Sequence, residues 1–415
     1  MIADAVAHPS LRQWLPAVAV AATLGVAICA TGDGLAIEGR VVLLVFALAI
    51  VGWTLSPADD LLVAGISVAA LIAVGATGLD DIARLARHEL IWLLAAAYVM
   101  AAAVRRTSLM DRLAIHVARG SRSLETLFYR LAALVAATAF IVPTTSGRAA
   151  LLLPVFLGFS DALRNVRATK ALSLMFPSII LLSACGVLTG AGAHLIALDV
   201  VDAGRDAARI GYLEWMGLML PIALLSSLAA TWLIVRMFLS PADRRQRSVL
   251  PPAPSGGMTG RETAMLAVLA VTILLWATDG LHNTGLATVA LVAALALTML
   301  SGGRMTPNAV AGAIERKLLL FLGATMLLGE ALVSSGAGAW IGQSLAHLLD
   351  GLLARPWAIA GLVAALALVS HVVMHSRSAR AAILIPALAF PLAEHGYSAT
   401  AVALLIAVGT GFCQM

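Results

Sequence analysis

The stretch PTTSGRAALLLP at residues 143–154 decides the fold, and a second stretch, SRSARAAILIP at residues 376–386, repeats its pattern. In both, hydroxyl residues come first, and an arginine, two alanines, three aliphatic residues and a proline follow. Arg148 and Arg380 occupy the same position, six residues before that proline. Each lies in an apolar segment, where a charged side chain is costly and usually faces protein or a water-filled cavity. The pattern predicts two tips that meet at mid-membrane and hold an anion.

The composition is that of a membrane protein. Of the 415 residues, 61% are hydrophobic and 12% charged, and the mean hydropathy is +0.97. Many segments approach the roughly 20 apolar residues that span a bilayer. The formal charge of +5 orients loops in such a protein and does not indicate nucleic-acid binding. Cys29, Cys185 and Cys413 have no spacing typical of a disulfide framework or a metal site. We expect an all-α polytopic membrane protein without a metal or cofactor.

The segments that flank the two tips follow one plan. Residues 126–160 are too short for two full spans and are broken at PTTSG, which is typical of a re-entrant hairpin buried in protein. The next span, 171–200, is interrupted by SACGVLTGAGA, where glycines make unwinding easy. After the polar linker at 240–257, continuous spans and a second broken hairpin at 357–393 repeat this order. The repeat is typical of secondary transporters.

The same plan predicts how the functional parts divide the chain. Continuous apolar segments are expected to form a scaffold and broken ones a mobile transport domain, with amphipathic helices in the membrane interface between them. The predicted parts are a scaffold at 1–125, a first transport segment at 126–238, a cytoplasmic linker at 239–261, further scaffold spans at 262–356 and a second transport segment at 357–415.

The distribution of basic residues predicts the orientation. If the N-terminus is cytoplasmic, eighteen of the 27 Lys and Arg residues face the cytoplasm, six face outside and three lie in the tips. Basic residues favour cytoplasmic loops. We therefore expect a multi-pass protein of the cytoplasmic (inner) membrane, with its N-terminus in the cytoplasm. Its first hairpin enters from the cytoplasm and its second from outside, so that the repeats are inverted.

These features resemble the divalent anion/sodium symporter family over nearly the whole chain. In that family, each tip carries Ser-Asn-Thr ahead of a run like AAILLP, and the matching residues here are Thr-Thr-Ser at 144–146 and Ser-Arg-Ser at 376–378. The family's Gly-Thr-Pro-Pro-Asn loop matches Gly-Ala-Gly-Ala-His at 190–194. The resemblance implies a homodimeric secondary transporter of small divalent anions that works by an elevator mechanism.

The sequence departs from the family at its asparagines, which are replaced by Thr145, Arg377 and His194. Sodium sites in the family use oxygen atoms at these tips and loops, so the departures argue against sodium coupling. Fixed arginines could neutralise a dianion instead, which favours exchange or coupling to protons through His194. The ordinary sodium-coupled symporter stays open as an alternative.

The predicted site combines hydroxyl groups, arginines and the N–H groups at the start of each second hairpin arm. The predicted substrate-binding residues are Thr144, Thr145, Ser146, Gly147, Arg148, Ser376, Arg377, Ser378 and Arg380. The predicted second loop, or coupling-ion site, consists of Gly190, Gly192, His194 and Thr410.

Other interpretations of these residues remain. The arginines could extend toward an interface or pair with a buried acid, and His194 could be a neutral cap on a broken helix. An anion channel lined by the same arginines is the alternative from another class. An enzyme is not expected, because no nucleophile arrangement, phosphate-binding loop or metal-ligand spacing is found. The chain ends at Met415, where the second broken helix should unwind, so we expect the last span to be missing.

Overall fold

The computed structural model describes residues 11–31, 34–142, 144–202, 210–247, 249–252, 257–348, 351–373 and 377–411. This part of the chain consists of helices and their connections, without a strand. Six of its helices are long and apolar enough to cross a membrane, or up to seven when α4 (Leu79–Ala86) and α5 (Glu89–Arg105) count as one span. The predicted all-α polytopic class is therefore confirmed.

The chain forms two compact units, which are named unit 1 and unit 2 here. Unit 1 comprises residues 1–87, 196–209 and 316–415, and unit 2 comprises residues 88–195 and 210–315. These units follow contacts between helices and are not the predicted scaffold and transport parts, which stay a prediction. The helix α10 (Gly192–Asp202) begins in unit 2 and ends in unit 1.

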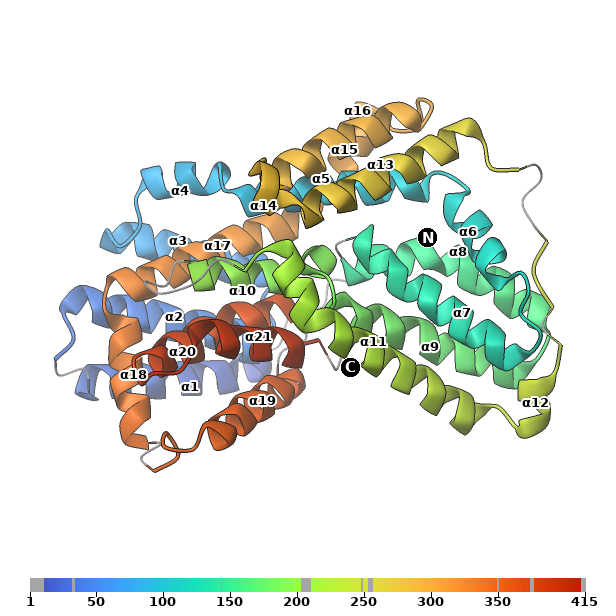
Figure 1. Ribbon diagram of the computed structural model, residues 1–415. Helices are drawn as coiled ribbons and strands as arrows, with labels where there is room; N and C mark the ends of the chain where they lie inside the picture. Colours follow the sequence, from blue (N-terminus) through green and yellow to red (C-terminus); the bar gives the residue numbers. More distant parts are fainter. Residues whose placement is uncertain are drawn as a thin grey trace. The chain divides into compact units, whose positions relative to one another are not determined.

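Unit 1 is built around a core of large apolar side chains. Its helices are α1 (Leu11–Thr31), α2 (Ile37–Leu55), α3 (Asp60–Val74), α4, α17 (Arg316–Ser334), α18 (Ala337–Leu348), α19 (Pro356–Val373), α20 (Arg377–Ala393) and α21 (Ala399–Gly409). The core joins α2, α3 and α17 and includes Ile28 of α1, Ala337 of α18 and Ile383 of α20. Trp53 packs edge-on against Phe321, with 5.3 Å between their ring centroids. The helices α19, α20 and α21 pack against one another (Figure 1).

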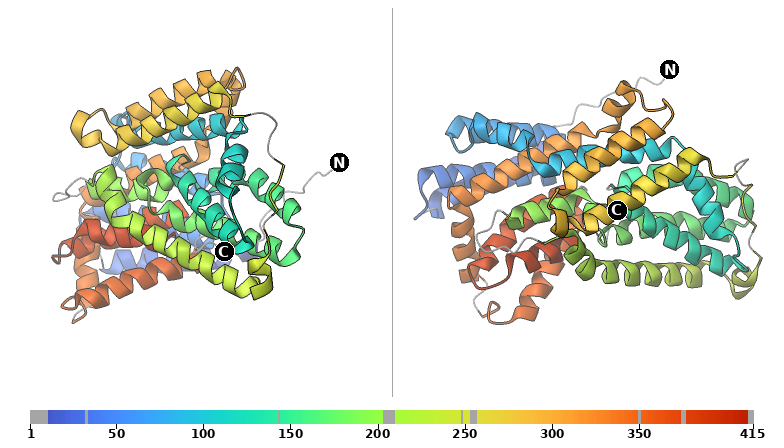
Figure 2. Two further views of the ribbon diagram at one scale, coloured as in Figure 1. Left: turned by 45° about the vertical axis from the view of Figure 1, so that its right-hand side comes forward. Right: turned by 45° about the horizontal axis from the view of Figure 1, so that its top comes forward.

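Unit 2 contains the first hairpin and the linker. Its helices are α5, α6 (Leu109–Ala118), α7 (Leu124–Ala137), η1 (Thr138–Phe140), α8 (Thr145–Leu163), α9 (Val166–Ala184), η2 (Leu188–Gly190), α11 (Tyr212–Phe238), α12 (Pro241–Arg245), α13 (Gly260–Ala277), α14 (Asp279–His282), α15 (Leu286–Leu300) and α16 (Pro307–Ala313). The green helices α8, α9 and α11 lie side by side in Figures 1 and 2. The alanine-rich faces of α5 and α15 pack closely, since small side chains let helices approach each other.

The helix breaks lie at the motifs that predicted them. Around PTTSG, α7 ends at Ala137 and α8 begins at Thr145, and Pro143 lies outside the described residues. After the first hairpin, α9 ends at Ala184 and α10 begins at Gly192. In the second hairpin, α19 and α20 are separated by residues 374–376, which also lie outside the described part. The re-entrant course of both hairpins and the inversion of the repeats stay predictions.

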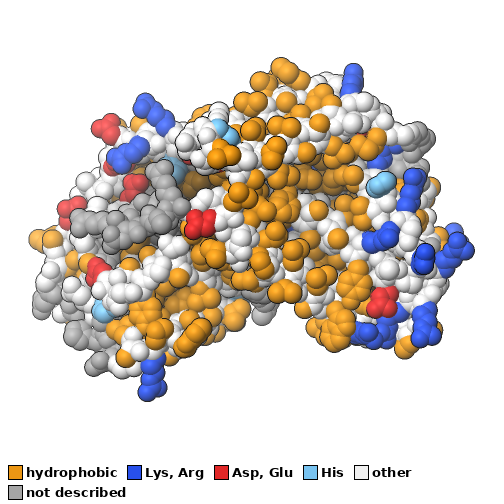
Figure 3. Space-filling model, in the orientation of Figure 1, with side chains coloured by type: hydrophobic (Ala, Val, Ile, Leu, Met, Phe, Trp, Pro, Cys, Tyr) orange, Lys and Arg blue, Asp and Glu red, His pale blue; other side chains and the backbone are white. Residues whose placement is uncertain are grey.

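The surface of unit 2 separates basic from apolar side chains. Figure 3 shows Lys and Arg side chains gathered at the end of unit 2 that carries α6 and α12, beside a broad apolar surface. An apolar surface of this extent is typical of contact with lipid, and basic residues are typical of its edges. The arrangement agrees with a membrane-embedded chain.

The polar linker begins as a helix fastened to the hairpin loop. Asp243 of α12 accepts hydrogen bonds from the Ser240 hydroxyl (2.7 Å), the Asn165 amide (3.2 Å) and Arg167 Nη1 (3.5 Å). The Ser240 hydroxyl and N–H, followed by Asn165, lower the pKa of Asp243 to about 2. Because this pKa lies below the ordinary value, the carboxylate stabilises the folded state at neutral pH and loses that effect only as the pH falls toward 2.

We predict that Asp243→Asn loosens the linker without unfolding the chain. The substitution removes the charge from four hydrogen bonds at a part-buried site, so limited proteolysis between residues 240 and 257 should become several-fold faster, while the thermal unfolding temperature falls only slightly. Asp80→Asn, an exposed acid at the start of α4, is the matched control. Equal cleavage rates in all three proteins would contradict the prediction.

Candidate functional site

The first tip is a capped helix start with hydroxyl groups. The hydroxyl of Thr144 is buried and accepts the Gly147 N–H at 3.0 Å, which caps α8. A side chain at Gly147 would collide with that hydroxyl. Ser146 is exposed and Thr145 is half-buried. The first N–H groups of a helix have no partner within it and carry partial positive charge, so this tip offers hydrogen-bond donors to an anion.

Arg148 is buried completely and faces protein acceptors. Its Nε donates to Thr138 Oγ1 at 3.0 Å and its Nη1 to the Ile180 carbonyl at 2.6 Å. Its Nη2 donates to the Val135 carbonyl and the Ser183 hydroxyl, each at 2.7 Å. At least four of the five guanidinium donors are therefore directed at the end of α7, at η1 and at the last turn of α9.

The partners of Arg148 explain why a charge is tolerated there. The last carbonyls of a helix have no partner within the helix, and an apolar environment offers no water to satisfy them. A guanidinium at a helix C-terminus donates to these carbonyls and is favoured by the negative end of the helix dipole. Arg148 thus holds the broken helices of the first hairpin together. Its direct contact with an anion stays a prediction.

The second tip places two arginines against the end of the next helix. Arg377 and Arg380 lie in the first turn of α20, and both are buried. Arg380 Nη2 donates to the Thr410 carbonyl at 3.0 Å, and Arg377 Nη2 donates to the Ala407 carbonyl at 3.3 Å. Both carbonyls belong to the C-terminal end of α21. Ser376 and the side chain of Ser378, which the sequence also places at this tip, lie outside the described residues.

The two matched arginines make equivalent contacts. Arg148 reaches a carbonyl 32 residues later, at the end of α9, and Arg380 reaches one 30 residues later, at the end of α21. In each case, the second arm of a hairpin is fastened to the C-terminal end of the following helix. The repeat in the sequence is therefore matched by a repeated interaction in the structure.

Gly190 lies in the loop after α9, where its backbone packs against the end of that helix. A side chain at Gly190 would overlap the Ala184 carbonyl oxygen, which is the last carbonyl of α9. Gly192 begins α10, two residues further on. In the second half of the repeat, the corresponding position is at the end of α21. Thr410 is buried there, and its hydroxyl donates to the Ala407 carbonyl at 3.0 Å.

His194 lies at the start of α10 and is fully buried. Its Nδ1 is 3.2 Å from the Val187 carbonyl oxygen, and its ring lies 5.0 Å from the Trp215 ring. Trp215 Nε1 in turn donates to the Cys185 carbonyl at 3.0 Å. The imidazole and the indole thus satisfy carbonyls of the unwound segment. This geometry favours the interpretation of His194 as a cap on a broken helix.

Each tip lies next to its own helix end. The contacts of Arg148 and of η1 with η2 bring the first tip close to the loop that contains Gly190 and His194 within unit 2. Arg377, Arg380 and Thr410 lie together in unit 1. The predicted meeting of the two tips stays a prediction.

The sequence did not single out Thr138, Ser183 or Trp215 as functional residues. Their polar groups fall in apolar segments at helix ends, and this position is the signal that would have indicated them.

Among the described residues, no group of three or more His, Cys, Asp or Glu is placed to hold a metal ion.

Comparison with known proteins points to one family. A family model described as the sodium:sulfate symporter transmembrane region matches residues 11–415. A membrane protein of Cupriavidus necator is 26% identical over 361 residues, which cover 80% of this chain and 69% of that protein. The crystal structure of the YdaH transporter of Alcanivorax borkumensis superimposes with a TM-score of 0.56 and 15% identity, covering 94% of this chain and 86% of that one. The last similarity concerns the fold alone.

We predict that Arg148→Gln mainly destabilises the folded protein. Each buried acceptor left without a donor costs about 1–3 kcal/mol, so the free energy of unfolding should fall by roughly 3 kcal/mol or more, measured by thermal unfolding in detergent. Arg164→Gln, at the exposed end of the same helix, should change it little. Unchanged stability together with a large loss of anion affinity would instead show that Arg148 acts directly on the anion.

We predict that Gly190→Ala disrupts the loop after α9, because its methyl group cannot fit beside the backbone oxygen of Ala184. The variant should unfold at a lower temperature and lose transport. Gly217→Ala, in α11 with open space around the new methyl group, is the control and should be neutral or slightly stabilising. A Gly190→Ala protein with wild-type unfolding temperature and transport would show that the loop is formed differently.

Proposed function

The chain belongs to the sodium:sulfate symporter transmembrane family, and on that premise we propose that it is a secondary active transporter of small divalent anions in the cytoplasmic membrane. The family is one of membrane anion transporters and not of enzymes. The proposed substrates are di- or tricarboxylates, or a sulfate-like oxyanion. The proposal includes an elevator mechanism in a homodimer with a cytoplasmic N-terminus, which follows from the resemblance of the broken hairpins to those of the family.

The first tip is the observation that carries this proposal. The hydroxyls and N–H groups of the half-buried Thr145 and the exposed Ser146 are donors for which the described part of the chain shows no acceptor. The buried Thr144 hydroxyl and the Arg148 contacts fix their position. Preorganised donors of this kind suit the oxygen atoms of a carboxylate or sulfate group.

The proposed role of the arginines is electrostatic. The hydrogen bonds of Arg148 and Arg380 to carbonyls leave the guanidinium charge in place, one turn inside each tip. A fixed positive charge in an apolar environment stabilises a nearby dianion over several ångströms, because screening there is weak. In this proposal the arginines neutralise the substrate charge from a distance, in place of the direct contact that the sequence predicted.

This role also bears on the coupling ion. Arg377 lies in the first turn of α20, where the family pattern has an asparagine, and a sodium ion beside a buried guanidinium is unfavourable. The proposed mechanism is therefore sodium-independent exchange, or transport coupled to protons. An empty carrier with fixed positive charges would return slowly, which favours exchange.

We predict that Ser146→Ala weakens the binding of a transported dianion by about threefold to tenfold, because one hydrogen bond to a charged group is worth roughly 1.5 kcal/mol or less at an exposed site. Affinity can be measured by thermal shift with candidate anions. Ser173→Ala, an exposed serine of α9, is the matched control. An unchanged affinity in the Ser146→Ala protein would place the anion elsewhere.

We predict that uptake into proteoliposomes does not change when sodium is replaced by potassium or choline, and that internal substrate or a proton gradient stimulates it. The reason is the arginine at the position of the family's asparagine. Counterflow with preloaded substrate distinguishes a carrier from an anion channel, which shows none. A steep, saturable requirement for sodium would restore the sodium-coupled symporter.

A further inference from the structure

A second polar site lies in unit 2, where α5 and α15 end and α13 begins. Residues from the connection after α5, the first turns of α6 and α13 and the end of α15 line a cavity of about 720 Å³. Its lining includes Arg112, Arg261, Glu262, Ser301 and Arg304. None of its lining residues belongs to the tips or to the loop around His194, so the cavity is separate from the proposed transport site.

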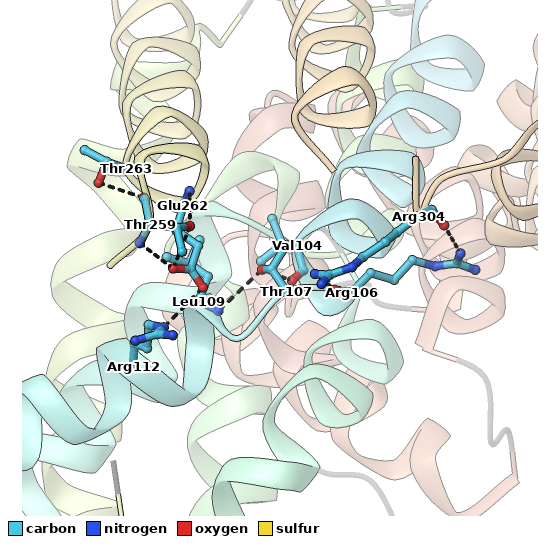
Figure 4. A network of polar contacts seen from close by, with 9 residues as sticks. All are labelled: Val104, Arg106, Thr107, Leu109, Arg112, Thr259, Glu262, Thr263 and Arg304. Carbon is cyan, nitrogen blue, oxygen red and sulfur yellow. Dashed lines mark hydrogen bonds and ion pairs between the residues drawn. The ribbon is translucent and has the colours of Figure 1, made fainter. Parts of the chain in front are cut away.

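One arginine of this cavity is already neutralised. Arg112 Nε donates to Glu262 Oε1 at 3.2 Å, and both side chains are largely buried. The carboxylate of Glu262 also accepts the N–H and the hydroxyl of Thr259 at 2.9 and 3.0 Å, which caps α13. Figure 4 shows the ion pair and the cap together. The carboxylate is thus fully engaged, and it fixes Arg112 in the wall.

Two further arginines are placed side by side. Arg304 Nη1 donates to the Arg106 carbonyl at 3.0 Å, and Arg106 Nη1 donates to the Arg304 carbonyl (Figure 4). Each guanidinium is therefore held beside the backbone of the other residue. A third arginine, Arg261, lies in the first turn of α13. Its guanidinium packs closely against Gly302, where any side chain would collide with it. In the part of the chain that the structure describes, none of these three arginines forms an ion pair with a carboxylate. The cavity therefore carries an excess of positive charge.

The position and lining of the cavity indicate the class of anion. The helix α13 is long and apolar enough to cross a membrane and begins at Gly260, so its first turn marks the edge of the apolar layer. Phosphate groups of lipids lie at this level, and basic pockets between membrane helices bind such head groups. Guanidinium groups match the oxygen atoms of a phosphate in pairs. Met265 and Leu300 supply apolar lining beside the arginines, as a glycerol ester would require.

We propose that this cavity binds a phosphate group through Arg261 and Arg304, with the Arg112–Glu262 pair as its rigid wall. A phosphate at this place comes either from an anionic phospholipid of the surrounding membrane or from a soluble phosphate compound.

Thermal unfolding of the purified full-length protein tests the proposal. The protein is titrated in detergent with phosphatidylglycerol, phosphatidylcholine and inorganic phosphate. Phosphatidylglycerol should raise the unfolding temperature, and the Arg261→Gln/Arg304→Gln protein should need at least tenfold more of it for the same increase, since each basic group near an anionic surface adds appreciably to binding. Phosphatidylcholine, whose head group has no net charge, should have a much smaller effect.

A control with the same change in net charge is available elsewhere in the chain. Arg87→Gln/Arg355→Gln removes two other exposed arginines and should respond to each compound like the wild type. If inorganic phosphate alone raises the unfolding temperature, in a manner that depends on Arg261 and Arg304, the site binds a soluble phosphate. The proposal is overturned if both double variants respond to phosphatidylglycerol and phosphate like the wild type, or if the two variants lose the response equally.

Discussion

The structure depends on how the carbonyl groups at the ends of broken helices are satisfied. A helix that stops inside an apolar layer exposes backbone groups that neither lipid nor water can pair with there. In this chain, the ends of α7 and α9 are paired by Arg148, and the end of α21 by Arg377 and Arg380. The same hydrogen bonds thus reduce both the free-energy cost of burying a guanidinium and the cost of ending a helix inside the apolar layer. Neither feature would be stable at this place without the other.

This pairing has consequences for the tips. Because Arg148 is anchored at three elements, the first turn of α8 is held in one position relative to α7 and α9. Thr144 caps that turn from the other side. The N–H groups and hydroxyls at the tip are therefore ordered before a ligand arrives, and ordering them costs no further free energy on binding. Preorganised donors of this kind suit the oxygen atoms of the small anion that we propose as the substrate.

The sequence predicted the helix breaks well but not the partners of the arginines. The order of hydroxyl, arginine, small and aliphatic residues located the starts of α8 and α20, since few other patterns place an arginine at fixed distance before a proline in an apolar run. The acceptors of Arg148 are two backbone carbonyls and the hydroxyls of Thr138 and Ser183, and they lie 10 to 35 residues away along the chain. Backbone carbonyls occur in every residue, so the sequence does not indicate which of them accept. The expectation for Arg148 was therefore a ligand or an acidic partner. In the same way, the glycines predicted unwinding after α9, but only the folded chain reveals that Gly190 packs on a carbonyl.

The arginines of this chain act differently according to what surrounds them. At the tips, carbonyl oxygens of the protein lie within reach, and Arg148 and Arg380 donate hydrogen bonds to them. At the ends of α5, α13 and α15, water is accessible and the nearest carboxylate is already engaged, so the guanidinium groups of Arg261 and Arg304 can bind an anion from outside the chain. An arginine therefore stabilises the fold where no water reaches it, and it is available to bind a ligand where water does. The depth at which an arginine lies, more than its presence, decides which of the two it becomes.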